Sequence, residues 1–179
     1  AAPRVGSGRG DGGWGRWGGG GPLGGHVDAA RIKSVNRAVG GRSSRTYFTM
    51  GPWTRVLAMI KRGDYVVMQF GHNDGGAFDD SARARGTIRG IGEETKEIEN
   101  PITKSHEVVH SYGWYLRQFI AQTRAAGATP LACTLVPRKT WKDGRIARRA
   151  AYALWAAAVA TAEGAQRVDL TGKIPSRKD

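Results

Sequence analysis

Residues 63–76 read Gly-Asp-Tyr-Val-Val-Met-Gln-Phe-Gly-His-Asn-Asp-Gly-Gly, and this stretch decides the fold. Its first half, from Asp64 to Phe70, is a continuous run of mostly apolar residues, which is typical of a parallel strand buried on both faces. Its second half, residues 71–76, is a polar turn rich in glycine. Because ligands bind at the carboxyl ends of the strands in parallel α/β sheets, this turn lies where a site is expected.

Short apolar runs alternate with helical patterns on both sides of this stretch. The runs Ile32 to Val39, Thr129 to Val136 and Gln166 to Leu170 are predicted strands. A first helix is predicted around Trp53, with Pro52 in its first turn. Two longer helices are also predicted, each from an apolar stripe at helical spacing. The first ends at Gly127, and its stripe is Val108, Val109, Tyr112, Tyr115, Leu116, Phe119 and Ile120. The second ends near Gly164, and its stripe is Ile146, Ala150, Leu154, Ala157 and Ala158.

This alternation of strands and helices predicts parallel strand pairing with right-handed crossovers. The expected fold class is therefore α/β, a three-layer α/β/α sandwich with a parallel sheet. Residues 1–29 are rich in glycine, which is costly to order, so they are predicted to be a poorly ordered N-terminal segment ahead of a domain at residues 30–179. The polar connection of residues 74–105 is expected to be either functional or disordered.

Net charge and composition limit the classes of binding partner that the chain is expected to have. The formal net charge of +13 fits either nucleic acid or an acidic polysaccharide, but no nucleic-acid-binding motif accompanies the basic residues. We therefore expect a polyanion that is not nucleic acid. No apolar run is long enough to predict a transmembrane helix, and no signal-peptide pattern is visible. The single cysteine, Cys133, excludes an intrachain disulfide and is predicted to be a buried small hydrophobe.

Two glycine-containing segments follow predicted strands, residues 36–46 (Asn-Arg-Ala-Val-Gly-Gly-Arg-Ser-Ser-Arg-Thr) and residues 71–76. Glycine lets the backbone approach a ligand and exposes its N–H, and Asn73 adds a side-chain N–H donor. A glycine N–H and an asparagine amide together can form an oxyanion hole for acyl transfer. Each segment also has a purely structural interpretation, residues 73–75 as a turn and Ser43 or Ser44 as a helix N-cap.

These two segments resemble the second and third conserved blocks of the SGNH hydrolases, the third in the form found in rhamnogalacturonan acetylesterases. The similarity to that family runs from about residue 30 to about residue 170 and includes residues 85–90, 94–98 and 112–115. The resemblance implies a flavodoxin-like SGNH fold and an esterase that removes acetyl groups from pectic polysaccharide, with no cofactor and no metal. It implies that Gly41 and Asn73 form the oxyanion hole. Members of the family are typically secreted or periplasmic.

The resemblance stops at the nucleophile and the base. The family's Gly-Asp-Ser block is not present, and Ser7, in Gly6-Ser7-Gly8, is a poor substitute. The Asp-x-x-His block has no match either, because Asp169 is followed by no histidine and is better interpreted as a polar residue at the end of a strand. A Ser–His–Asp mechanism needs all of these groups. We therefore expect an incomplete domain that is inactive as given.

Two other functions remain open. His106, Glu107 and His110 form an H-E-x-x-H motif, which on a helix could bind Zn²⁺ and would make the chain a metallopeptidase. The interpretation without metal is an amphipathic helix whose polar edge carries two histidines. The other alternative is a non-catalytic domain that binds polyanions. His72, directly after a predicted strand, could order the turn or contact substrate.

Overall fold

The computed structural model describes residues 28, 30–136, 141–142, 145–146 and 150–171. The chain divides into two compact units, Ala1–Gly41 and Arg42–Asp179, and each is described by itself. The predicted N-terminal segment of residues 1–29 lies outside the described residues except for Asp28. The predicted domain boundary after residue 29 stays a prediction.

In the first unit, the predicted strand from Ile32 to Val39 is wrong. These residues have no regular structure, and Ile32 and Val35 are 53% and 51% exposed. None of them pairs with another described segment in a ladder. An extended segment without such a partner leaves its N–H and C=O groups to water, so an apolar pattern alone does not make it a strand.

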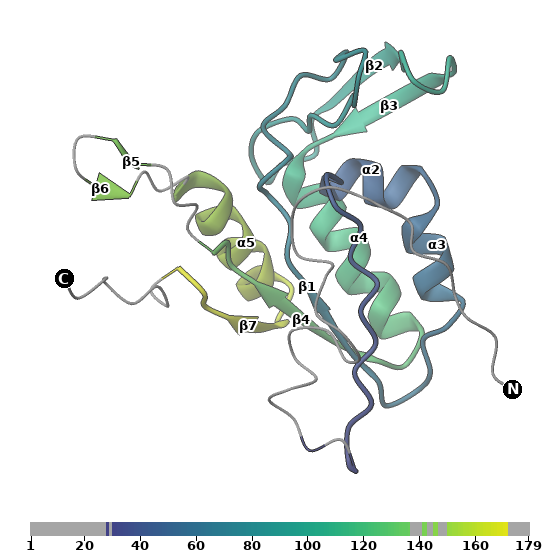
Figure 1. Ribbon diagram of the computed structural model, residues 1–179, viewed down its shortest axis with the longest axis vertical. Coiled ribbons are helices and arrows are strands. Elements are labelled where there is room, and N and C mark those ends of the chain that lie inside the picture. Colours follow the sequence, from purple (N-terminus) through teal and green to yellow (C-terminus); the bar gives the residue numbers. More distant parts are fainter. Residues whose placement is uncertain (1–27, 29, 137–140, 143–144, 147–149, 172–179) are drawn as a thin grey trace, which may run out of the picture. The chain divides into compact units, whose positions relative to one another are not determined.

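The second unit is built on a three-stranded parallel sheet of β1 (Tyr65–Met68), β4 (Thr129–Cys133) and β7 (Gln166–Val168), in the order β1-β4-β7 (Figure 1). The helix α4 (Tyr112–Ala125) lies between β1 and β4 in the sequence, and α5 (Ala150–Ala162) lies between β4 and β7. Right-handed crossovers that advance in one direction put both helices on the same face. The α/β fold with a parallel sheet is confirmed.

The strand β1 is only half covered. Met68 is buried and Val66 packs against the core, whereas Tyr65 and Val67 are 68% and 48% exposed. In the part of the chain that the structure describes, β1 is an edge strand and the helices cover one face. The prediction that this strand is buried on both faces is therefore wrong, because a continuous apolar run does not reveal how many layers pack on it.

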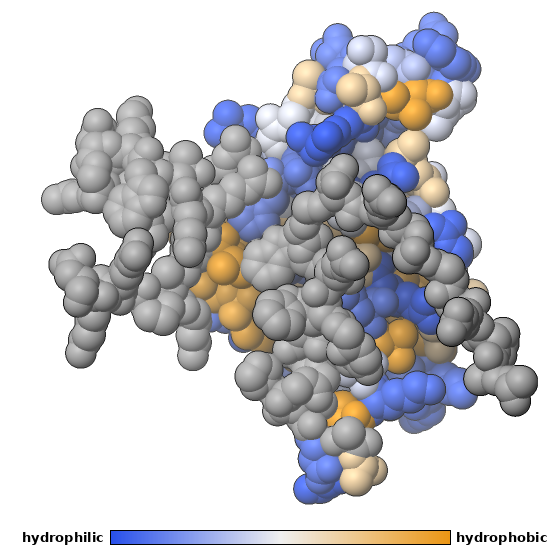
Figure 2. Space-filling model, in the orientation of Figure 1, coloured by the Kyte–Doolittle hydropathy of each residue, from blue (hydrophilic) through white to orange (hydrophobic). Residues whose placement is uncertain are grey.

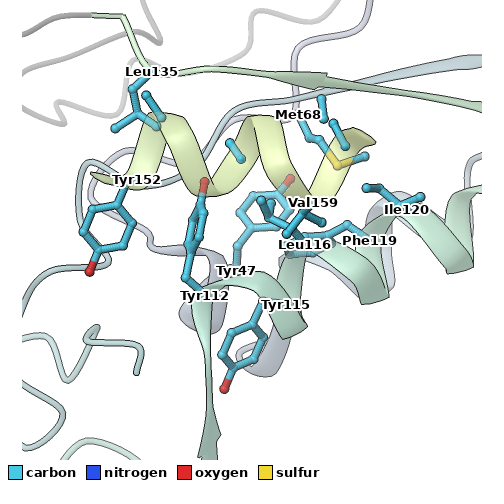
Figure 3. Close-up of a cluster of buried hydrophobic side chains, with 14 of the residues drawn as sticks. Tyr47, Met68, Tyr112, Tyr115, Leu116, Phe119, Ile120, Leu135, Tyr152 and Val159 are labelled. Carbon is cyan, nitrogen blue, oxygen red and sulfur yellow. The ribbon is translucent and has the colours of Figure 1, made fainter. Parts of the chain in front are cut away.

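The core lies between that covered face and the two long helices (Figure 3). In α4 the residues on the predicted apolar stripe point into it, and Phe119 stacks on Phe70 with ring centroids 4.9 Å apart. Burying a side chain of this size stabilises the fold by about 1.5–3 kcal/mol. The buried members of the core are Tyr47, Trp53, Met68, Tyr112, Tyr115, Leu116, Phe119, Ile120, Ala132, Leu135, Tyr152, Ala153, Ala156, Val159 and Ala160.

Local signals set the helix ends. The short helices α2 (Ser44–Thr49) and α3 (Pro52–Leu57) meet at Gly51, whose φ of 93° lies in the left-handed region, and Pro52 occupies the first turn of α3 as predicted. Gly127, with φ of 78°, ends α4 as predicted. None of the helices in the described part of the chain is long and apolar enough to cross a membrane. Cys133 is buried, as predicted.

The segment before α4 is a strand, where the apolar stripe predicted helix. β2 (Thr95–Glu99) and β3 (His106–His110) form an antiparallel hairpin that stands away from the sheet (Figure 1). The helix begins only at Tyr112, because the Ser111 side chain caps it by accepting a hydrogen bond from the Trp114 N–H at 3.0 Å. Figure 2 shows the hairpin, at the top of the view, as mostly hydrophilic on this face.

The connection of residues 74–105 is held in place by main-chain hydrogen bonds. The Thr87 N–H donates to the Asp74 main-chain oxygen at 2.9 Å, and Ile88 exchanges hydrogen bonds with His110 and Tyr112. These bonds and strand β2 show that the connection is held by main-chain hydrogen bonds at several points, so disorder is the wrong prediction for it. Further along, β5 (Trp141–Lys142) pairs with β6 (Arg145–Ile146), so Ile146 does not belong to α5 as predicted.

Candidate active site

The turn after β1 is held by the carboxylate of Asp74, which is fully buried. Its Oδ1 accepts hydrogen bonds from the Ser44 N–H, at 2.9 Å, and from the Ser44 hydroxyl. Its Oδ2 accepts a hydrogen bond from the Gly71 N–H at 2.9 Å. With the bond from Thr87 to its main-chain oxygen, Asp74 joins the start of α2, the end of β1 and the following connection at one point.

The environment of Asp74 perturbs its titration. Burial raises the pKa of its carboxyl group to about 6, although the hydrogen bonds from Ser44 and Gly71 lower it. These donors are neutral, so they offset only part of the cost of removing a negative charge from water. A solvated aspartate titrates near pH ~4, whereas Asp74 changes charge much closer to neutral pH.

Asn73 precedes this anchor and is half-buried. Its Nδ2 donates a hydrogen bond to the main-chain oxygen of Arg42 at 2.9 Å. A side-chain amide nitrogen carries two hydrogens in a fixed plane, so committing one of them fixes the direction of the other. The amide is thus a pre-oriented N–H donor at the carboxyl end of a parallel strand, where the sequence placed the site.

The two serines at the start of α2 have different tasks. Ser43 is the N-cap: its side chain accepts from the Thr46 N–H at 3.1 Å, and Thr46 Oγ1 accepts from the Ser43 N–H at 2.9 Å. This reciprocal pair is a capping box and confirms the N-cap interpretation for Ser43. Ser44 is also fully buried and holds Asp74.

Gly41, the other predicted oxyanion-hole residue, is the last residue of the first unit. It is exposed and has φ of 78°, a left-handed conformation that favours glycine. That conformation accounts for a glycine at this position. Its predicted pairing with the Asn73 amide stays a prediction, and so does substrate contact by the half-buried His72.

The H-E-x-x-H residues lie on β3, so the helical geometry that the zinc interpretation requires is wrong. Side chains four residues apart on a strand share a face but are separated by about 13 Å, at a rise of about 3.3 Å per residue. Two imidazoles bound to one Zn²⁺ must each lie within about 2.1 Å of it. Among the described residues, no three His, Cys, Asp or Glu side chains are grouped so that they could hold a metal ion.

Glu107 instead pairs with a buried arginine. Arg45, whose side chain is fully buried, donates from Nε to Glu107 Oε1 at 2.8 Å and from Nη2 to Oε2 at 2.6 Å. Asn100 donates to the same carboxylate, and Arg45 also donates to the main-chain oxygen of Gly86 at 3.0 Å. Burial raises the pKa of Glu107, but the hydrogen bonds and charge of Arg45, together with Asn100, outweigh it and lower the pKa.

Asp169 follows β7 directly, which confirms it as a polar residue at the end of a strand. Its Oδ1 accepts hydrogen bonds from Thr171 and, at 2.9 Å, from the Thr134 hydroxyl. The Thr171 hydroxyl and N–H, with Thr134, lower its pKa to about 2, so it is a charged turn residue. Ser7 lies outside the described residues.

Comparison with known proteins decides the family. The model of the GDSL-like lipase/acylhydrolase family matches residues 5–179. The chain belongs to this family. The rhamnogalacturonan acetylesterase of Emericella nidulans is 32% identical over 119 residues, which are 66% of this chain and 47% of that protein. The Bacillus subtilis protein named Probable rhamnogalacturonan acetylesterase YesY is 32% identical over 133 residues, which are 74% of this chain and 48% of that one.

This GDSL-like chain spans about half the length of the curated relatives it matches. Among solved structures, that of the Bacillus subtilis protein YXIM is similar with a TM-score of 0.57 and 21% identity, over 82% of this chain and 35% of that chain. At this identity the similarity concerns the fold alone. It supports the predicted assignment to the SGNH hydrolase fold.

The sequence singled out Asn73 but not the residues that hold it. Asp74 was interpreted as a turn residue, and Ser44 only as a possible cap. The sequence feature that could have predicted the role of Asp74 is an acidic residue just after a buried strand. A carboxylate buried there is destabilised by desolvation unless hydrogen-bond donors surround it. Arg45 gave no local signal, because its partner Glu107 is 62 residues away in the sequence.

Proposed function

We propose that this chain contributes the oxyanion-stabilising part of an esterase that removes acetyl groups from pectic polysaccharide of the rhamnogalacturonan type. The observation that carries the proposal is the Asn73 amide, anchored by the Arg42 main-chain oxygen at the carboxyl end of β1. The names of the two relatives supply the substrate class. The net charge of +13 would attract a polymer that carries galacturonate carboxylates.

The reaction is acyl transfer. A serine oxygen attacks the acetyl carbonyl carbon, and the negative charge that develops on the carbonyl oxygen is stabilised by the second Asn73 N–H and, by resemblance, by the Gly41 N–H. The family's histidine takes the serine proton and passes it to the sugar oxygen, which leaves as a free hydroxyl, and water then releases acetate from the acyl-enzyme. The serine and histidine belong to the family's Gly-Asp-Ser and Asp-x-x-His blocks, which have no counterpart among these 179 residues.

The test is Asn73→Ala in the full-length gene product, with acetate release from acetylated rhamnogalacturonan as the measurement. Removing one oxyanion donor is expected to lower kcat by about 10²–10³. A matched control is Gln69→Ala, because Gln69 is also a half-buried amide that donates to a main-chain oxygen, that of Thr134 at 2.8 Å. Its kcat should stay within about threefold of the unsubstituted protein.

A loss below tenfold for Asn73→Ala would reject the assigned role. If the full-length protein binds acetylated pectin in a salt-dependent way but releases no acetate, the non-catalytic polyanion-binding alternative replaces the esterase.

A further inference from the structure

The turn that carries Asn73 is fixed on both sides of that residue. Two positions before it, the Gly71 N–H donates to Asp74 Oδ2 at 2.9 Å. One position after it, Asp74 is buried and its main-chain oxygen accepts hydrogen bonds from the Thr87 N–H, at 2.9 Å, and from the Thr87 hydroxyl, at 3.3 Å. A displacement of the Asp74 side chain would therefore move the backbone on which the Asn73 amide stands.

The other end of the Asn73 hydrogen bond is tied to the same carboxylate. Asn73 donates to the Arg42 main-chain oxygen, and two residues later in the chain Ser44 donates its N–H and its hydroxyl to Asp74 Oδ1. The Asp74 carboxylate thus sets the distance between the Asn73 amide and the Arg42 main-chain oxygen that orients this amide. Both ends of the hydrogen bond between Asn73 and Arg42 therefore depend on Asp74 for their position.

We propose that Asp74 and Ser44 are positioning residues for the oxyanion donor, which keep the Asn73 amide against the Arg42 main-chain oxygen. This inference rests on the proposed function of Asn73 and adds two residues that act through it. Asp74 and Ser44 are completely buried, so they do not touch the substrate themselves. A displacement of about 1 Å at a catalytic group can cost a factor of about 10² in rate, which is why such an anchor matters.

The experiment is a double-mutant cycle between Ser44→Ala and Asn73→Ala, measured as kcat for acetate release by the full-length gene product. Ser44→Ala removes a donor to Asp74 Oδ1 while the Ser44 N–H keeps its bond. We expect Ser44→Ala alone to lower kcat about tenfold. In the Asn73→Ala background it should change kcat less than twofold, because the amide that it positions is already gone.

The matched control is Ser111→Ala. Ser111 is fully buried like Ser44 and lies at the start of a helix, but its hydroxyl donates to the Gly92 main-chain oxygen at 2.6 Å and does not contact Asp74. Its effect on kcat, compared at an equal folded fraction, should be small and should be the same in both backgrounds.

The outcomes separate the two proposals. If Ser44→Ala lowers kcat by the same factor with and without Asn73, or by no more than Ser111→Ala, the positioning role is overturned and Ser44 is only structural. If Asn73→Ala itself costs less than tenfold, the proposed function fails. A second variant, Asp74→Asn, tests the carboxylate directly: a loss of at least tenfold that vanishes in the Asn73→Ala background supports the positioning role, and an additive loss contradicts it.

Discussion

Two carboxylates in the second unit, one fully buried and one partly buried, are held in opposite ways. Asp74, in the turn after β1, is surrounded by neutral donors, the Ser44 hydroxyl and the N–H groups of Ser44 and Gly71. Glu107, on β3, meets the buried guanidinium of Arg45 through two hydrogen bonds. The first carboxyl has a pKa raised to about 6, and the second has a pKa lowered from the ordinary value.

The difference shows what each carboxylate contributes. When a carboxylate is paired with a buried arginine, removing either partner leaves an uncompensated charge in the interior. A charge held by neutral donors is less stable as an ion, yet it can join several backbone segments at once. The ion pair attaches the β2–β3 hairpin to α2, whereas Asp74 attaches the proposed oxyanion donor to the same helix.

The largest effect is expected from Arg45→Met, which removes the fully buried guanidinium and leaves the partly buried Glu107 carboxylate without its cation. The expected loss is about 3–5 kcal/mol in the free energy of unfolding at pH 7, measured by urea denaturation. The control is Arg117→Met: the Arg117–Glu93 pair is far more exposed, with 23% and 74% of the side chains accessible, so less than ~1 kcal/mol should be lost. Equal losses in the two variants would remove the distinction between the buried pair and the exposed one.

The second prediction concerns how the stability contributed by Asp74 and by Glu107 changes with pH, in opposite directions. Because the pKa of Asp74 is about 6 when folded, against 3.8 for an ordinary aspartate, the folded state binds more protons between those values. Its contribution to stability therefore falls as the pH rises from ~4 to ~6, by about 3 kcal/mol. Glu107, with its pKa lowered from 4.5, contributes stability that is present above pH 4.5 and is lost as the pH falls below it.

Urea denaturation of the unsubstituted protein, Asp74→Asn and Glu107→Gln at pH 4 and pH 7 measures these slopes. Relative to Asp74→Asn, the unsubstituted protein should become less stable as the pH rises. Relative to Glu107→Gln, it should become more stable. Burial raises the pKa values of the nearby Tyr112 and Tyr115, so neither titrates in this interval. Slopes of the same sign would show that neutral donors and an arginine hold the two acids equally well.

The sequence alone predicted the parallel sheet and much of the core. The runs that became β1, β4 and β7 lie where they were expected, and Gly127 ends α4. Periodicity failed at residues 106–110, since apolar residues at positions 108 and 109 fit one face of a helix but also fit a strand. Residues 106–110 form a strand because residues 95–99 pair with them and because the Ser111 cap starts the helix only after them.

For the candidate site, the strand-end rule predicts Asn73 as a functional residue, because ligands bind at the carboxyl ends of parallel strands. It could not find the network around Asp74 and Arg45, because the partners are 30 and 62 residues distant in the sequence. A hydrogen bond between such residues is a property of the packed structure, and no local spacing encodes it. The same limit explains the wrong zinc geometry, since a motif says which ligands exist but not which element carries them.

The smallest effect, and the sharpest test of the neutral anchor, is the stability of Ser44→Ala. A hydrogen bond to a charged group is worth about 1.5 kcal/mol or more, so the variant should lose about 1.5 kcal/mol at pH 7, where Asp74 is ionised. The loss should shrink at pH 4, because the protonated carboxyl needs the Ser44 hydroxyl less. Ser111→Ala, whose hydroxyl hydrogen-bonds with the main chain of Gly92 and Trp114, should lose about 1 kcal/mol at both pH values. A loss for Ser44→Ala that does not change with pH would mean that its hydroxyl stabilises α2 rather than the charge on Asp74. The contrast between Asp74 and Glu107 would then rest on burial alone.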